Sequence, residues 1–153
     1  MPSSATRTQP SAQAADRTGR SALVAAACIA VATAVNLALF AIGRGTDATL
    51  RVDPGLGEPN HLIVGGDVAW KTVVPLALGA LVVSLVARRS RRWTTIVIVA
   101  GAAAAGVSIP FVVTGAHDTT TGVLLAGMHT VAGLTFVAIG TRAHRVGAVD
   151  GRG

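Results

Sequence analysis

Four arginines stand close together in the middle of the chain, between two long apolar runs. The cluster consists of Arg88, Arg89, Arg91 and Arg92 and is interrupted only by Ser90. An arginine at the centre of a bilayer costs about 2.5–3.5 kcal/mol even on the most lenient insertion scale. We therefore interpret the cluster as a tight cytoplasmic turn between two membrane-spanning helices, where it also contacts anionic lipid headgroups.

The composition agrees with this interpretation. Of the 153 residues, 51% are hydrophobic and only 13% are charged, whereas about a quarter of the residues in a soluble domain are charged. The net charge of +6 could indicate a nucleic-acid partner, but the basic residues lie at the ends of apolar runs and tyrosine is absent. This placement is typical of a membrane protein, so we expect the lipid bilayer, and no nucleic acid, as the partner.

Several segments are long and apolar enough to cross lipid, since about 20 helical residues at about 1.5 Å each span a hydrocarbon core of about 30 Å. We expect an all-α bundle of four transmembrane helices with short connections. A disordered tail (1–20) and a basic tail (142–153) flank this membrane domain (21–141). A cleaved signal peptide is the rival interpretation of the first run, but that run exceeds the usual length of about 7–15 residues. A soluble bundle would need a polar helix face that the third run lacks. The expected spans are residues 21–43, 68–87, 93–114 and 122–140.

The distribution of basic residues predicts the orientation. On the outer side of the membrane we place only three basic residues, Arg44, Arg51 and Lys71. Lysine and arginine are enriched in cytoplasmic segments, so we expect a multi-pass protein of the cell (inner) membrane with both termini cytoplasmic. The ten basic residues that we place inside are Arg7, Arg17, Arg20, Arg88, Arg89, Arg91, Arg92, Arg142, Arg145 and Arg152.

The connections and the small residues add detail to this picture. Residues 44–67 carry glycine and proline turn signals and are expected to form an outer loop, with a short strand-like piece at 48–52. Pro75 is expected to bend the second span. Residues 101–106 of the third span contain pairs of small residues four positions apart, which allow helices to approach closely. They suggest packing within the bundle, a homo-oligomer or a membrane-protein partner.

His129 is the most distinctive polar residue of the four spans. Both His129 and Asn36 lie about two turns below the outer boundary of their spans. We expect them to line a small outward-facing cavity, with Lys71, His117 and Asp118 at its mouth, that holds a ligand or relays protons. In the alternative interpretation, Asn36 and His129 hydrogen-bond each other and only lock the helices together.

Lys71 also has a structural interpretation, because Asp67 lies four residues earlier and the two can form an ion pair on one helix face.

Nothing in the sequence indicates catalysis or a bound cofactor. Cys28 is a lone cysteine in an apolar run, where it serves for packing. The histidines lack the H-x-x-x-H and H-E-x-x-H spacings of metal sites, and the chain has no G-x-S-x-G nucleophile motif. We therefore expect neither a metal nor an enzyme.

The order of several short motifs resembles a family of short bacterial four-span membrane proteins, domain of unknown function 6069. The resemblance covers residues 21–142 and implies four transmembrane helices, but no activity, substrate or catalytic residue. The matching landmarks are Asn36-Leu37, Ile42-Gly43-Arg44, Val74-Pro75-Leu76, Pro110, Asp118, Met128-His129 and Gly133.

Two functions remain open. The first is a non-catalytic membrane component that packs against itself or a partner through small-residue faces. The second is a small transporter or proton-coupled subunit with an outward-facing polar cavity around His129 and Asn36.

Overall fold

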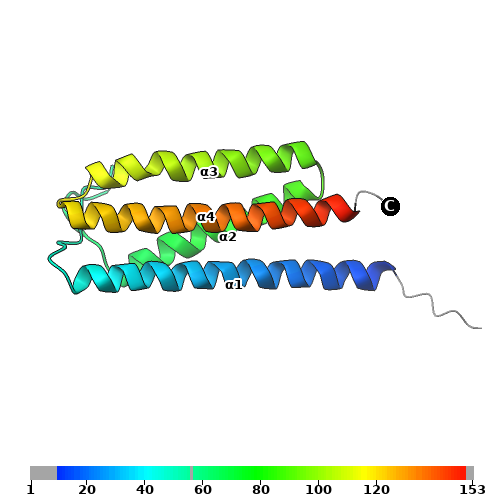
Figure 1. The fold of residues 1–153 in the computed structure, drawn as a ribbon, viewed down its shortest axis with the longest axis horizontal. Helices are drawn as coiled ribbons and strands as arrows, with labels where there is room; N and C mark the ends of the chain where they lie inside the picture. Colours follow the sequence, from blue (N-terminus) through cyan, green and yellow to red (C-terminus); the bar gives the residue numbers. More distant parts are fainter. Residues whose placement is uncertain (1–9, 56, 151–153) are drawn as a thin grey trace, which may run out of the picture.

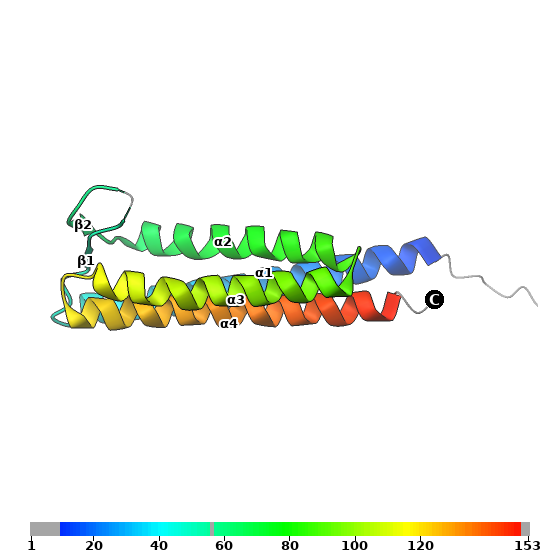
Figure 2. The same cartoon turned by 90° about the horizontal axis from the view of Figure 1, so that it is seen from above.

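The computed structural model describes residues 10–55 and 57–150. Four helices run antiparallel along one another, and a two-stranded hairpin lies across one end (Figures 1 and 2). This confirms the predicted all-α bundle. The elements are α1 (Pro10–Arg44), β1 (Arg51–Val52), β2 (His61–Leu62), α2 (Gly65–Ala87), α3 (Arg91–Thr114) and α4 (Thr119–Asp150).

Within the described chain, each of the four helices contains a segment long and apolar enough to cross a membrane. The bundle also carries large apolar side chains on its surface. Phe111 and Leu134 are 72% and 67% exposed, whereas the polar side chains of Asn36 and Thr94 are 2% and 0% exposed. Such an extensive apolar surface is stable only when another apolar phase covers it. The fold is therefore that of a multi-pass membrane protein. The spanning segments are Gly19–Arg44, Gly65–Ala87, Arg91–Thr114 and Thr119–Val146.

Both terminal helices extend into the expected tails. α1 begins at Pro10, inside the segment expected to be disordered, and α4 continues through Arg142 and Arg145 to Asp150. Alanine and arginine favour helix in both extensions, and proline is well tolerated in the first turn of a helix. Residues 1–9 and 151–153, the ends of the two expected tails, lie outside the described residues.

The two ends of the bundle differ in character. At one end, which we name the arginine end, α2 turns into α3 through the four clustered arginines, and the described ends of α1 and α4 lie there too (Figure 1). Ser90 caps α3, since its Oγ accepts a hydrogen bond from the Trp93 N–H at 3.5 Å. The turn is therefore tight, as predicted.

The opposite end, which we name the loop end, is covered by residues 45–55, 57–64 and 115–118. The short antiparallel hairpin β1–β2 lies in the first of these segments, where the sequence predicted a strand-like piece. Val52 also forms a bridge to Ala116, and the Asp53 N–H donates to the Gly115 carbonyl at 2.8 Å. These backbone bonds fasten the hairpin to the α3–α4 connection and hold it over the helix ends.

Helix α4 lies between α1 and α3 and also contacts α2 (Figure 1). Phe136 of α4 inserts between two glycines, Gly79 of α2 and Gly101 of α3. A Cβ atom at position 79 would lie 2.8 Å from Cε2 of Phe136, and one at position 101 would overlap the same ring. Gly133 similarly faces Ala105, whose Cβ would lie 3.0 Å from a Cβ at 133. Gly101 and Ala105 of the small-residue segment of α3 therefore pack against α4 of the same chain, whereas Gly106 does not.

Candidate ligand site

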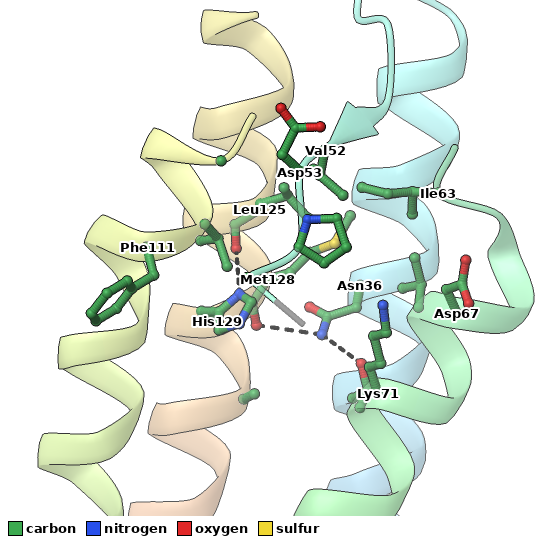
Figure 3. Close-up of a pocket in the computed structure, with 17 residues that line it drawn as sticks. Asn36, Val52, Asp53, Ile63, Asp67, Lys71, Phe111, Leu125, Met128 and His129 are labelled. Carbon is green, nitrogen blue, oxygen red and sulfur yellow. Dashed lines mark hydrogen bonds between the residues drawn. The ribbon is translucent and has the colours of Figure 1, made fainter. Parts of the chain in front are cut away.

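A pocket of about 360 Å³ lies at the loop end of the bundle, beneath the segment that follows β1 (Figure 3). All four helices contribute side chains to it, and its size lies at the lower end of the range of about 300–1,000 Å³ typical of small-molecule sites. Three residues that the sequence singled out, Asn36, Lys71 and His129, line it together. The other lining residues are Val52, Asp53, Pro54, Gly55, Ile63, Asp67, Val68, Thr72, Phe111, Val112, Gly115, Leu125, Met128 and Ala132.

Asn36 lies at the buried side of the pocket and joins three helices. Its Nδ2 donates to the Thr72 hydroxyl of α2 at 3.0 Å and to the Met128 carbonyl of α4 at 3.4 Å. A carbonyl can only accept a hydrogen bond, so the reversed amide would place oxygen against oxygen. The orientation of the amide is therefore defined. Its oxygen, Oδ1, is buried and has no hydrogen-bond partner.

An unpartnered buried acceptor is unusual, because most buried polar atoms in proteins are hydrogen-bonded. Leaving one unsatisfied costs about 1–3 kcal/mol. Since Asn36 lines the pocket, this unpartnered oxygen lies next to the space that a bound molecule would occupy.

His129 does not bond to Asn36, contrary to the purely structural alternative. Its Nδ1 lies 2.9 Å from the Leu125 carbonyl, one turn earlier in α4. Because that carbonyl can only accept, Nδ1 carries a proton, and Nε2 is an acceptor whenever the ring is in its neutral form. Nε2 makes no hydrogen bond to the described residues, so it is a second free acceptor on a residue that lines the pocket.

Lys71 contributes the pocket's positive charge. Lys71 and Asp67 make no direct ion pair, although their charges interact at longer range. Oδ2 of Asp67 instead lies 3.0 Å from Nε2 of His61 and accepts the Val64 N–H at 3.2 Å. Asp67 is thereby committed to capping α2 and to holding β2. Lys71 is exposed, and its ammonium has no hydrogen-bond or ion-pair partner among the described residues.

A second histidine–aspartate contact lies at the rim, where Oδ1 of Asp53 is 3.0 Å from Nε2 of His117. The pKa of Asp53 is lowered mainly by the hydrogen bond from the Asn60 N–H and also by the one from His117. His117 thus acts on the pocket through Asp53, which the sequence analysis missed. The signal that could have found Asp53 is its place directly before Pro54, in a turn next to the predicted strand.

Asp118 is not among the residues that line the pocket. It is the N-cap of α4, and its carboxylate accepts from the Thr121 N–H at 2.8 Å and the Thr121 hydroxyl at 2.7 Å. It also accepts from the N–H of Thr49 at 3.0 Å and from the Thr49 hydroxyl. The hydroxyls of Thr121 and Thr49 hold the pKa of this carboxyl well below its usual range. Asp118 therefore stays ionised and ties the loop to α4.

Thr72 is a further site residue that the sequence analysis missed. It is 4% exposed and positions the Asn36 amide. The sequence signal that could have identified Thr72 is its position directly after Lys71. Among the described residues, no group of three or more histidine, cysteine or acidic side chains is arranged to hold a metal ion.

The fold and the pocket together define a class: a multi-pass membrane protein with a partly polar pocket at one end of a four-helix bundle. The chain belongs to a family of unknown function, DUF6069, whose profile matches residues 16–146. No curated protein and no solved structure matches the chain.

Proposed function

We propose that this protein binds a small ligand within the membrane, in the loop-end pocket, and is not an enzyme. The observation that carries the proposal is the buried Oδ1 of Asn36, which lacks a donor although it borders a pocket of ligand size. Two further polar groups of the lining, the ammonium of Lys71 and Nε2 of His129, make no hydrogen bond within the described chain, although the charges of Lys71 and Asp67 interact at longer range. Apolar side chains form most of the remaining wall, as in typical ligand sites.

The packing below the pocket favours binding over conduction. Ala132 lines the pocket, and Phe136 follows one turn further toward the arginine end. The ring of Phe136 fills the space between Gly79 and Gly101. A path through the bundle would require this ring to move, so we infer a pocket closed at its base. Two functions were considered from the sequence. For the second, a transporter or proton-coupled subunit with a cavity around His129 and Asn36, this arrangement supports ligand binding in the cavity but not transport.

Filling the pocket tests this function. Ala132→Phe places an aromatic ring in the cavity, and we expect the variant to fold but to lose any small molecule that co-purifies with the wild-type protein. Mass spectrometry of extracts from protein purified out of its native membrane measures the loss. Leu134→Phe is the matched control, because Leu134 lies on the same helix and is 67% exposed. Equal ligand content in all three proteins, or none in any, would contradict the proposal.

We infer from the positive-inside rule that the arginine end lies in the cytoplasm, together with both termini, and that the protein resides in the cell membrane. In a Cys28→Ser background, we expect a cysteine at Gly55 to react with an impermeant maleimide on intact cells. A cysteine at Ser90 should react only after the cells are permeabilised. The reverse pattern would invert the orientation.

A further inference from the structure

We propose that the ligand is an uncharged hydroxyl compound with a hydrocarbon body, whose O–H group lies beside Asn36 and Thr72 at the floor of the pocket. This inference rests on the proposed binding function and names its ligand class. Three features of the pocket carry it: the hydrogen-bonding capacity left unused at the floor, the apolar wall, and the placement of the charged side chains.

The floor of the pocket has both an unused acceptor and an unused donor. Oδ1 of Asn36 is buried and accepts no hydrogen bond. The Thr72 hydroxyl accepts from Nδ2 of Asn36 at 3.0 Å, and it donates its own proton to no group of the described chain. The two residues are 2% and 4% exposed, and both line the pocket. A hydroxyl group both donates and accepts, so it can satisfy both residues, whereas an ammonium only donates and an ether only accepts.

His129 adds a further acceptor to the same space. Its Nδ1 is bonded to the Leu125 carbonyl, and Nε2 of the neutral ring makes no hydrogen bond to the described residues. Figure 3 shows Asn36 and His129 around one space. Free acceptors therefore outnumber free donors in this part of the pocket, and a ligand without a donor leaves them unsatisfied.

A water molecule has the same hydrogen-bonding capacity as a hydroxyl group, but it does not match the rest of the pocket. The pocket measures about 360 Å³, whereas one water takes up about 30 Å³. Apolar side chains form most of the wall, among them Val68, Leu125 and Met128. Covering such a wall with hydrocarbon is favourable, because it removes apolar surface from water. A hydroxyl group joined to a hydrocarbon therefore fits the pocket better than a single water.

The charged side chains of the lining do not select an ionic ligand. Asp53 and Asp67 accept backbone N–H groups, which favours their ionised forms, and each keeps one oxygen free of hydrogen bonds. Lys71 carries the opposite charge and interacts with Asp67. Two negative charges thus disfavour an anion, and the ammonium of Lys71 disfavours a cation. At the floor, a charged ligand group would be buried beside the uncharged side chains of Asn36 and Thr72, which is very unfavourable.

Exposed residues border the pocket on two sides. Asp53 and Gly55 are exposed on the loop side, and Lys71 and Phe111 are exposed on α2 and α3. A hydroxyl compound dissolved in water and one dissolved in the bilayer therefore both have a way to the floor.

The test compares four probes with similar hydrocarbon parts: 1-hexanol, its isomer methyl pentyl ether, hexylamine and hexanoate. The full-length protein is placed in lipid nanodiscs at neutral pH, where the amine is a cation and hexanoate is an anion. Equilibrium dialysis gives each affinity, which is divided by the partition of the same probe into empty nanodiscs. We expect 1-hexanol to bind at least about five-fold more tightly than the ether, the effect of one net hydrogen bond. It should also bind more tightly than either ion.

Nuclear magnetic resonance locates the bound alcohol. Asn36 and Asn60 are the two asparagines of the sequence, so ¹⁵N-labelled asparagine gives two side-chain amide signals. Saturation with 1-hexanol should shift the signal of Asn36 and leave that of Asn60, which lies in the exposed loop. If 1-hexadecanol, which stays in the bilayer, also shifts the Asn36 signal, the ligand comes from the bilayer. If only 1-hexanol shifts it, the ligand comes from water, and a shift with neither alcohol overturns the inference.

Two substitutions assign the preference for the alcohol to the floor of the pocket. Asn36→Leu and, independently, Thr72→Val should each lower the ratio of alcohol affinity to ether affinity toward one. Thr130→Val is the matched control, because Thr130 is exposed on α4 and bonds to the Ala126 carbonyl of its own helix. It should leave the ratio unchanged. Equal affinities in the wild type, tighter binding of either ion, or a preference that survives both substitutions would overturn the hydroxyl assignment.

Two further outcomes separate this inference from the proposed function. If the alcohol and the ether bind the wild type equally and Ala132→Phe abolishes both, the pocket binds ligands but the ligand class is wrong. If no probe binds the wild type above the level of empty nanodiscs and Ala132→Phe leaves the co-purifying molecules unchanged, both the ligand class and the proposed function are wrong.

Discussion

Gly101→Leu is expected to destabilise the bundle strongly, because no side chain fits between α3 and the ring of Phe136. Even a Cβ atom at position 101 would overlap that ring, and the ring is held on its other side by Gly79, where a Cβ would lie 2.8 Å away. Helix association in lipid depends on close packing rather than on a hydrophobic driving force. We expect a loss at or above the upper end of the roughly 1–3 kcal/mol typical of overpacking. The midpoint of unfolding in mixed detergent measures it.

Two variants make this result specific. Gly106→Leu lies on the same helix, but position 106 has no neighbouring atom within 4 Å, so we expect almost no effect. Phe136→Ala should partly rescue Gly101→Leu, because the leucine then occupies the space that the ring leaves. An interaction energy near zero in this double-mutant cycle would show that the ring and the glycine do not act as a pair.

The apolar segments could be predicted because their positions depend on one large energetic cost. Placing a charge in hydrocarbon is so unfavourable that the boundaries follow from the positions of charged residues such as Arg44, Arg88 and Arg91. The helices of the structure begin and end within a few residues of the predicted spans at these points. The depth of a residue within a span could be predicted for the same reason. Asn36 and His129 were counted to the same level, with Lys71 nearer the outer boundary, and all three line one pocket.

The partners of these residues were not predictable, because depth does not give the direction in which a side chain points around its helix. Helices that are apolar on all sides carry little signal for rotation. Asn36 therefore meets Thr72 and the Met128 carbonyl, whereas His129 turns toward its own helix. The role of Asp118 was hidden for a related reason, since capping depends on the position at which α4 begins.

Asn36→Asp and Asn36→Leu are expected to change stability very differently, although both alter the same buried side chain. The aspartate has no N–H to offer the Met128 carbonyl and would bury a charge in the membrane interior. We expect it to cost about 2.5–3.5 kcal/mol, the insertion penalty of a central aspartate. Leucine removes the unsatisfied oxygen together with the amide. The Thr72 hydroxyl can bond to its own helix instead, so we expect stability equal to or above that of the wild type.

The two variants should nevertheless have the same effect on ligand binding. Both remove the amide that presents Oδ1 at a fixed position, and we expect each to lower ligand retention about ten-fold, in line with the loss of one charge-assisted or well-buried hydrogen bond. A stable Asn36→Leu variant that no longer retains ligand would identify Asn36 as a binding residue that costs the unliganded fold some stability. If Asn36→Leu is instead as unstable as Asn36→Asp and retains ligand normally, the amide serves only to join α1, α2 and α4. In that case the unpartnered Oδ1 of Asn36 no longer supports the proposal that the pocket binds a ligand.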